Sequence, residues 1–544
     1  MSSKVAQYLQ EHVVGEVLTS KSVRNYFSTD GSVFRLEPQI VVYPRNTSDV
    51  RKVARFSWQL AERGKLLSIT ARGKGSGQAG EGLGSGVMLV FPAHMNKLLE
   101  LDTGKGIVRV QPGIIYKNLQ NTLHTHGRFL PPYPSSIDFA TIGGAVANNT
   151  AGEKTIKYGA TKEFVKELSV VLANGELINT LRLNKRELNK KMGLTSFEGE
   201  IYRQLDALIT DNWDLIQKIG FDVSKNTAGY NIKDVKRKDG SFDLTPLMVG
   251  SQGTLGIVTQ ATIATEPYNP NTTLIAAYFD DIKRAEDAVQ KLLPLKPSAL
   301  EMVDRHLLEF IYKNNPAQLK GLVEPPFPEL VLLTEFDDVA DRKQKRLSKR
   351  AKKILETHAT EFSVAKDEHE QEMLWKIRHS AAAVIWHVEG TKKALPIIED
   401  GIVPKEKFEM YLKGIYDIFE KAKLDVAVWG HAGDANVHLQ PFLDLGKVGD
   451  RQKVFKIMDD YYNMVMDMGG STAGEHNDGR LRAPYLPQLY GKEIYELFRK
   501  VKAIFDPYNT MNPGVKIDVK REDVVPLLRK EYSMEHLSDH MPRT

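Results

Sequence analysis

The distribution of apolar and polar positions divides the chain into two parts of different character. In the first part, short β-branched runs such as residues 87–91 and 257–265 follow glycine-rich loops, which predicts strands joined by irregular segments. In the second part, apolar residues recur at helical spacing in 282–293 and 342–357 and alternate with further strand-like runs. The composition changes near residues 266–270, which contain two prolines, so a domain boundary is expected there.

The composition excludes several classes of function. The net charge is only +5, and basic and acidic residues are interleaved, which argues against a nucleic-acid-binding surface. The sequence contains no cysteine, which excludes disulfides, thiol catalysis and an iron–sulfur cluster held by its own thiolates. No apolar run reaches the length of a membrane span, and the first residues lack the apolar region of a signal peptide. We therefore expect a cytoplasmic protein, and leave open a peripheral attachment to the inner face of the membrane.

The densest glycine run, residues 72–86, contains a Gly-x-Gly-x-x-Gly match that begins at Gly75. The Rossmann dinucleotide fingerprint requires a helix directly after these glycines, but a strand is predicted here, so that interpretation is rejected. The remaining interpretation is a backbone cradle, because glycines let amides approach an anion closely. Two more glycine-rich stretches, within 131–159 and at 250–258, each abut a predicted strand and support it.

A second group of residues carries candidate metal chemistry. His431 and His438 lie seven positions apart, and Glu475 is followed directly by His476. Two imidazoles and a carboxylate suit zinc or manganese, and a further imidazole suits a general base. Residues seven apart on a straight strand face opposite sides, so the segment between the first two histidines must bend.

The N-terminal half resembles the PCMH-type FAD-binding domain of the vanillyl-alcohol oxidase flavoproteins. The resemblance rests on Val41–Pro44, Arg72–Gly77, Pro134–Ser136, Thr141–Gly152 and Gly253–Ile257. It implies FAD, and no convincing counterpart of the histidine that binds FAD covalently in some members is present, so the cofactor is expected to be non-covalent. The implied FAD-binding residues are Arg72, Gly73, Lys74, Gly75, Ser76, Gly77, Pro134, Ser135, Thr141, Gly143, Gly144, Asn148, Asn149, Gly152, Tyr158, Gly159, Gly253, Thr254, Gly256, Ile257 and Asn512.

The C-terminal half resembles the FAD-linked oxidase C-terminal domain of D-2-hydroxyacid dehydrogenases, which include D-lactate dehydrogenase, D-2-hydroxyglutarate dehydrogenase and the flavin subunit of glycolate oxidase. This resemblance rests on the motif from His431 to His438, the Glu-His pair at 475–476 and the turn at 512–514. The resemblance implies that His431, His438 and Glu475 hold a divalent metal, zinc or manganese. It also implies His476 as the base, Arg378 and Lys393 as carboxylate-binding residues, and Asn436 as a hydrogen-bonding partner of the substrate.

These resemblances define the expected organisation of an α+β protein. Its parts are an N-terminal helical extension at 1–34, a PCMH-type FAD-binding domain at 35–265, a substrate or cap domain with the metal site at 266–480, a segment at 481–516 that returns to the FAD domain, and a polar tail at 517–544 on which no structure is expected.

The implied reaction is oxidation of a D-2-hydroxy acid to the 2-oxo acid. His476 would remove the hydroxyl proton with help from the metal, and the hydride would pass to N5 of FAD. D-lactate is the first choice of substrate, and D-2-hydroxyglutarate or glycolate is the alternative. A family oxidase acting on a sugar acid or lactone, and a non-catalytic flavin subunit for electron relay or assembly, are the rival interpretations.

The absence of cysteine implies a separate electron acceptor: a quinone, a cytochrome, an iron–sulfur or other electron-transfer protein, or oxygen. A homodimer is left open. Four residues depart from the family motifs: Lys74, Gln252, Ala435 and Asn477. Asparagine adopts a left-handed conformation easily, whereas Ala435 is expected to shift Asn436 or to narrow the substrate space.

Overall fold

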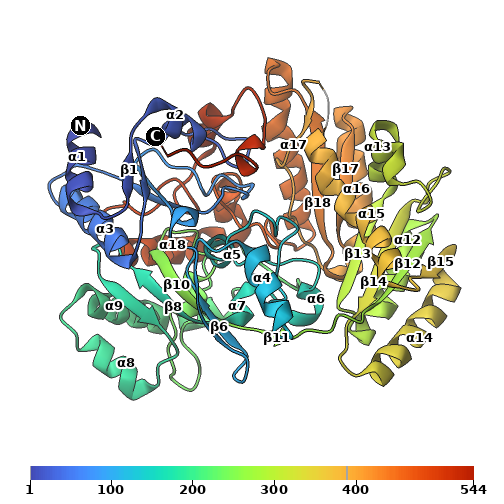
Figure 1. Cartoon of the computed structure of the whole chain (residues 1–544), viewed down its shortest axis with the longest axis horizontal. Helices are drawn as coiled ribbons and strands as arrows, with labels where there is room; N and C mark the ends of the chain where they lie inside the picture. Colours follow the sequence, from blue (N-terminus) through green and yellow to red (C-terminus); the bar gives the residue numbers. More distant parts are fainter. Residues whose placement is uncertain (1, 388–389, 544) are drawn as a thin grey trace.

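Two sheets in the N-terminal half and one larger sheet in the C-terminal half organise the chain (Figure 1). The computed structural model describes residues 2–387 and 390–543. The first two sheets lie in the left lobe of Figure 1 and the third in the right lobe. Helix α17 (Val448–Asp467) lies between the lobes in that view.

The first sheet has the strand order β1-β2-β4-β3, formed by β1 (Glu16–Leu18), β2 (Ile40–Tyr43), β4 (Val87–Val90) and β3 (Ile69–Arg72). Strands β2, β3 and β4 are parallel, and β2 and β4 are buried at every position, as continuous apolar runs in a parallel sheet require. Helix α3 (Thr47–Ala61) begins where the side chain of Asn46 accepts from the N–H of Asp49. Helices α1 (Ser2–His12) and α2 (Lys21–Tyr26) flank β1, so the N-terminal extension also contributes a strand.

The second sheet is antiparallel, with the order β5-β6-β10-β8-β9. Its strands are β5 (Leu98–Asp102), β6 (Ile107–Val110), β10 (Ile257–Ala264), β8 (Val165–Val171) and β9 (Leu177–Thr180). Strand β10 alternates buried and half-buried residues, which marks one face as core. Its helices are α4 (Tyr116–Thr125), α5 (Ile142–Asn148), α6 (Thr155–Tyr158), α7 (Thr161–Phe164), α8 (Lys185–Met192), α9 (Phe197–Asp211), α10 (Trp213–Gln217) and α11 (Thr245–Met248). The short strands β7 (Arg128–Phe129) and β11 (Glu266–Pro267) pair with each other.

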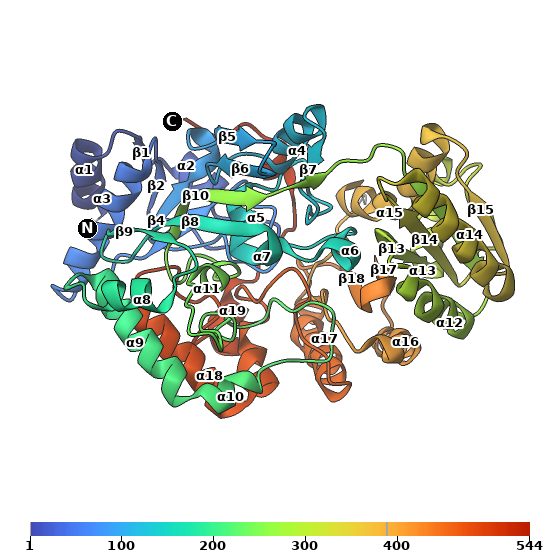
Figure 2. The ribbon, with the colours of Figure 1, turned by 90° about the horizontal axis from the view of Figure 1, so that it is seen from below.

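The third sheet has the order β15-β12-β14-β13-β17-β18-β16, and its neighbouring strands are antiparallel. Its strands are β12 (Thr273–Phe279), β13 (Ala299–Asp304), β14 (Leu330–Phe336), β15 (Glu361–Val364), β16 (Lys393–Ala394), β17 (Val426–His431) and β18 (Asn436–Leu443). One apolar core joins it to α12 (Ile282–Leu292), α14 (Asp341–His358), α16 (Phe408–Ala422) and α17, and another joins it to α13 (Arg305–Asn314) and α15 (Glu368–His387). Figure 2 shows these helices around the sheet. Because both faces are covered, β13 and β14 are buried at every position.

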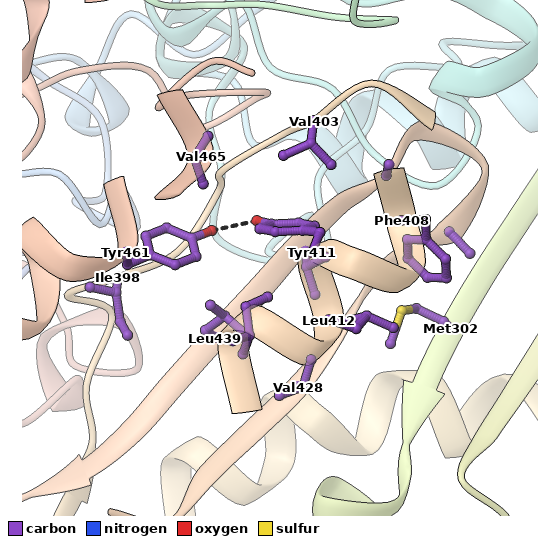
Figure 3. Close-up of a cluster of buried hydrophobic side chains, with 14 of the residues drawn as sticks. Met302, Ile398, Val403, Phe408, Tyr411, Leu412, Val428, Leu439, Tyr461 and Val465 are labelled. Carbon is purple, nitrogen blue, oxygen red and sulfur yellow. Dashed lines mark hydrogen bonds between the residues drawn. The ribbon is translucent and has the colours of Figure 1, made fainter. Parts of the chain in front are cut away.

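A pair of tyrosines lies in the core between α16 and α17 (Figure 3). The hydroxyls of Tyr411 and Tyr461 are 2.6 Å apart. Tyr411 donates to the carbonyl of Gly401 at 3.0 Å, and the N–H of Gly401 donates to Tyr461 at 3.1 Å. This buried clamp fixes the backbone directly after residues 399 and 400, which form part of the site described below.

After α18 (Leu486–Phe505), the chain returns to the first sheet. The N–H of Ile69 donates to the carbonyl of Thr510, and the N–H of Asn512 donates to the carbonyl of Ile69, both at 2.8 Å. Beyond α19 (Arg521–Val524), the tail for which no structure was expected packs on the N-terminal segment, where the N–H of Arg529 donates to the carbonyl of Val33 at 3.0 Å. That expectation was wrong because the tail's partners lie about five hundred residues away, where a local polarity pattern carries no signal. Across the described ranges, no helix combines the length and apolar character needed to cross a membrane.

Candidate active site

A β-hairpin brings the two motif histidines onto one face of the third sheet. His431 ends β17, a single turn of 3-10 helix follows at Ala432–Asp434, and β18 starts at Asn436. His431 pairs with Asn436, and Trp429 pairs with His438. Directly paired residues share a face and positions alternate along a strand, so His431 and His438 face the same side. The bend predicted from the seven-residue spacing is therefore a hairpin turn.

The ligand atoms expected for a metal lie within 3.3 Å of one another. Nε2 of His431 is 3.1 Å from Oε1 of Glu475, and Nε2 of His438 is 3.0 Å from the same oxygen. The two Nε2 atoms are 3.3 Å apart. All three side chains are almost completely buried.

The donor set of this cluster fits a cation. Nδ1 of His431 lies 2.8 Å from Glu301, and Nδ1 of His438 lies 3.3 Å from Glu399, so each Nδ1–H has a carboxylate to donate to. This tautomer leaves a lone pair on each Nε2, and both lone pairs face a carboxylate oxygen. Burial opposes protonation of His431, yet Glu301 raises its pKa to about 9, so the carboxylates favour a positive charge at Nε2: the ring's own second proton, or a cation in its place. The arrangement is that of two histidines and a carboxylate in a zinc- or manganese-type site.

A buried lysine that the sequence did not single out forms an ion pair with Glu475. Nζ of Lys225 lies 3.0 Å from Oε2 of Glu475 and 3.6 Å from Asp434. Burial opposes ionisation of Glu475, but Lys225 and His431 hold its pKa well below the usual value. Glu475 is therefore ionised, with one oxygen on Lys225 and the other directed at the histidines.

His476 lies beside this cluster and is more exposed to solvent than either histidine of the cluster. Its side chain is 30% exposed, whereas the exposure of His431 and His438 is 5% and 7%. Nδ1 is 2.5 Å from Oε2 of Glu399, and Nε2 is 3.4 Å from Oε1 of Glu475. Burial disfavours the imidazolium, but the carboxylates of Glu399 and Asp400 raise the pKa of His476 well above its usual value. The raised pKa favours the imidazolium, and once Nε2 has lost its proton the ring still donates through Nδ1 and presents Nε2 as a proton acceptor.

The acidic pair Glu399 and Asp400, which sequence reasoning missed, orients the histidines. Asp400 has a φ of +75° and accepts from the N–H of Glu475 at 2.9 Å and that of His476 at 2.6 Å. Glu399 also accepts from the fully buried Arg482 at 2.9 Å. The only sequence signal was an acidic pair after the apolar run 395–398.

A cavity of about 710 Å³ connects this cluster to the glycine loops. Its wall includes sixteen of the predicted FAD-binding residues, namely Arg72, Gly73, Lys74, Gly75, Ser76, Gly77, Pro134, Ser135, Thr141, Gly143, Gly144, Asn148, Gly152, Gly253, Gly256 and Ile257. His431, His438, Glu475 and His476 lie in the same wall, together with Arg378, Trp429 and Gln440. The cavity therefore places a flavin-sized space directly against the histidine cluster.

Five predicted FAD-binding residues lie outside the cavity wall: Asn149, Tyr158, Gly159, Thr254 and Asn512. Three of them hold the surrounding structure together instead. The side chain of Asn149 accepts from the N–H of Lys162, Tyr158 donates to Asp337, and Asn512 donates to the carbonyls of Glu81 and Gln252. Thr254 bonds Tyr230, and Gly159 ends α6 with a φ of +88°.

The backbone of the first glycine loop fits an anionic group. Within the described residues, the backbone N–H groups of residues 74–78 donate to no protein acceptor. Backbone amides in a folded protein are almost always paired, and a run of free amides from glycine-rich chain forms an anion-binding nest. Gly75 has a φ of +83°, which favours glycine. The loop therefore fits the pyrophosphate of FAD.

The three remaining predicted residues differ in position. Arg378 lies in the cavity wall, and its Nε donates to Oε2 of Glu301 at 2.9 Å, the carboxylate whose other oxygen binds His431. Lys393 lies on the edge strand β16, outside the wall. Asn436 is also outside the wall, because its amide donates to the carbonyls of Asp400 and Gly401.

The departures from the family motifs have local explanations. Asn477 has a φ of +64°, as the left-handed preference of asparagine predicted. Ala435 has a φ of +51° and does not line the cavity, so it does not narrow the substrate space. Gln252 links two segments: it donates to Asn148 and accepts from the N–H of Gly479, both at 2.9 Å.

Comparison with known proteins identifies the family of each half of the chain. Residues 38–181 match the FAD binding domain family, and residues 269–515 match the family of FAD linked oxidases, C-terminal domain. The expected two-domain architecture is thereby confirmed. The chain is similar in fold to a 4-ethylphenol oxidase from Gulosibacter chungangensis, with a TM-score of 0.69 at 15% identity over 96% of this chain and 98% of that one.

Three relatives are named as acting on hydroxy acids. Glycolate oxidase subunit GlcD of Bacillus subtilis (strain 168) is 30% identical over 503 residues, covering 91% of this chain and 92% of that one. D-lactate dehydrogenase of Archaeoglobus fulgidus is 26% identical, covering 87% and 90%. D-2-hydroxyglutarate dehydrogenase of Escherichia coli (strain K12) is 30% identical over 93% of this chain but 50% of its own length, so the chain spans about half of that relative.

Proposed function

Because the chain belongs to the family of FAD-dependent D-2-hydroxyacid dehydrogenases within the PCMH-type flavoproteins, we propose that it oxidises a D-2-hydroxy acid to the 2-oxo acid. One observation carries the proposal: the Nε2 atoms of two histidines and a carboxylate oxygen converge, beside the more exposed His476, in the wall of the cavity that the glycine loops line. This is the arrangement needed to bind and deprotonate a hydroxyl group next to a flavin.

Two bound groups complete the site. FAD would supply the acceptor for the substrate hydride, and a zinc or manganese ion on His431, His438 and Glu475 would lower the pKa of the substrate hydroxyl. Residues 73–77 would hold the FAD pyrophosphate through their backbone, and Lys225 would keep Glu475 ionised. The chain's remaining task is to position the substrate and to accept its proton.

His476 is assigned as the base. Its Nε2 is 3.4 Å from the metal-side oxygen of Glu475, so a hydroxyl oxygen bound at the cluster lies within reach of Nε2. When Nε2 takes the proton, the imidazolium is stabilised by Glu399 at Nδ1. The backbone of His476 is held by Asp400, which fixes the direction of the ring relative to the cluster.

Arg378 is assigned to the substrate carboxylate. It lies in the cavity wall, and its attachment to Glu301 couples its position to that of the metal ligand His431. Among the described residues, Lys393 does not reach the wall, so the site near His476 offers one strong carboxylate anchor rather than two. This favours a monocarboxylate such as D-lactate over D-2-hydroxyglutarate, with glycolate as the smaller alternative.

The electrons then pass to a separate acceptor, for which a quinone, a cytochrome or an electron-transfer protein is proposed. A panel of D- and L-2-hydroxy acids, assayed at steady state with an artificial dye, tests the substrate assignment. We expect the highest kcat/KM with D-lactate and little turnover of L-lactate. If none of the acids is turned over, the rival role of a non-catalytic flavin subunit for electron relay is favoured. If a sugar acid or lactone is turned over without the metal, the chain is instead a family oxidase for that substrate.

A further inference from the structure

The last residues of the chain close one side of the cavity. Residues 528–543, here called the C-terminal strap, lie outside both matched family ranges. Met534 and Leu537 of the strap are part of the cavity wall, and Leu537 is only 2% exposed. The strap therefore contributes apolar surface to the space that the glycine loops line.

The strap is attached to the N-terminal segment that runs beside the first glycine loop. Leu528 forms a β-bridge with Phe34. The guanidinium of Arg529 donates to the carbonyls of Asp30 and Ser32, and the hydroxyl of Tyr532 donates to the carbonyl of Gly31 at 2.9 Å. In Figure 1 the C-terminus accordingly lies next to the blue N-terminal elements. The two ends of the chain thus form one layer over the loop.

One contact joins the strap to the glycine loop itself. The carbonyl of Gly75 accepts from the N–H of Gly31 at 2.9 Å and from Nε2 of His536 at 3.0 Å. Burial and the nearby Arg72 lower the pKa of His536 to about 4, so at neutral pH its ring is neutral and Nε2–H is the donor. The C=O and N–H groups of a trans peptide point in opposite directions, so a Gly75 carbonyl held by the strap turns the Ser76 N–H the other way. Ser76 belongs to the run of unpaired amides in the cavity wall.

We propose that the C-terminal strap is a FAD-binding element, which presents Met534 and Leu537 to the cofactor and holds the loop amides toward its pyrophosphate through His536. The proposal rests on the FAD site of the proposed function. It predicts that the strap controls how tightly FAD is retained, and that it does so independently of the hydroxy-acid chemistry.

The test measures FAD affinity in the full-length chain. Apoprotein is titrated with FAD, flavin fluorescence is followed, and FAD release is measured after ultrafiltration. Leu537→Ala and His536→Ala should each raise the Kd for FAD by about tenfold, as loss of one buried contact predicts. Lys530→Ala, an exposed position on the same strap, is the matched control and should stay within twofold of wild type.

The melting temperatures of the apoproteins separate binding from folding. Under the proposal, both variants gain less stability than wild type when FAD is added, beyond any loss of apoprotein melting temperature that follows from truncating a buried side chain. Equal losses of melting temperature with and without FAD, at an unchanged Kd, would overturn the proposal and leave the strap a structural role only. Since no hydroxy acid is present, failure of the substrate assignment would not affect this result.

Discussion

Oε2 of Glu399 lies 2.5 Å from Nδ1 of His476, which makes Glu399 the group that sets the tautomer of the proposed base. The same carboxylate receives Nδ1 of the metal-side His438 at 3.3 Å and the guanidinium of Arg482 at 2.9 Å. One buried side chain therefore connects the proposed base His476, the proposed metal ligand His438 and the positive charge of Arg482. Loss of its charge should disturb base and metal site together.

We predict that Glu399→Gln lowers the rate of flavin reduction by about 10- to 100-fold, the range found for residues that orient metal-bound histidines. The amide no longer stabilises the His476 imidazolium, so the pH at which the rate rises should shift to a lower value, because the pKa of His476 loses its largest raising contribution. Stopped-flow reduction across pH checks this. A slower rate with an unchanged pH profile would contradict the orienting role.

Substitution of the proposed metal ligands should remove the metal and leave FAD bound. We predict that His431→Ala and Glu475→Gln lose bound zinc or manganese and flavin reduction, and keep FAD, because neither residue belongs to the glycine loops. Metal content by mass spectrometry and the flavin absorbance are the measurements. The exposed His369→Ala is the control and should retain both groups. Full metal content in the ligand variants would refute the site.

The role of Arg378 in binding the substrate carboxylate can be tested by substituting Arg378 and Lys393 separately. Arg378→Gln should raise the KM for D-lactate by about 10- to 100-fold, as loss of a charge-assisted hydrogen bond predicts. Lys393→Gln should change that KM by less than about threefold, because Lys393 lies outside the cavity wall. A large effect at Lys393, seen with D-2-hydroxyglutarate and not with D-lactate, would instead assign it to a second carboxylate.

Ala435 offers a test of local strain. Its φ of +51° is a left-handed conformation that costs an alanine roughly 1 kcal/mol or more, and glycine adopts it without that cost. Ala435→Gly is therefore expected to raise the free energy of unfolding by about 0.5–1 kcal/mol after the entropic cost of glycine is subtracted. Urea denaturation at equilibrium measures the change. Because the methyl group of Ala435 is buried in the core, a loss of stability would show that its packing outweighs the strain.

The sequence pattern predicted those parts of the site that lie close together in the chain. His431 and His438 share a hairpin, and Glu475 and His476 are adjacent. Their residue types and spacing therefore indicated a candidate metal site with a neighbouring base. Elements with a local apolar pattern were predicted for the same reason: the predicted strands at 87–91 and 257–265 are β4 and β10, and the predicted helices at 282–293 and 342–357 are α12 and α14.

The residues that the sequence did not reveal act through contacts between distant segments. Lys225 meets Glu475 across 250 positions, and Glu399 meets His476 across 77. Neither stands in a motif of its own, and a buried charge is recognisable only once its partner is in place. The C-terminal strap was missed in the same way, because its polar sequence is stabilised by backbone carbonyls near the N-terminus.

The central claim is that His476 deprotonates a D-2-hydroxy acid bound at the metal cluster beside the flavin. Anaerobic single-turnover reduction of the flavin by D-lactate tests it directly, in wild type and in His476→Ala with FAD and metal content verified. The account predicts bleaching of the wild-type flavin by D-lactate and not by L-lactate, and a loss of about 10²- to 10⁴-fold in the variant. A His476→Ala flavin that is reduced at the wild-type rate would contradict the account.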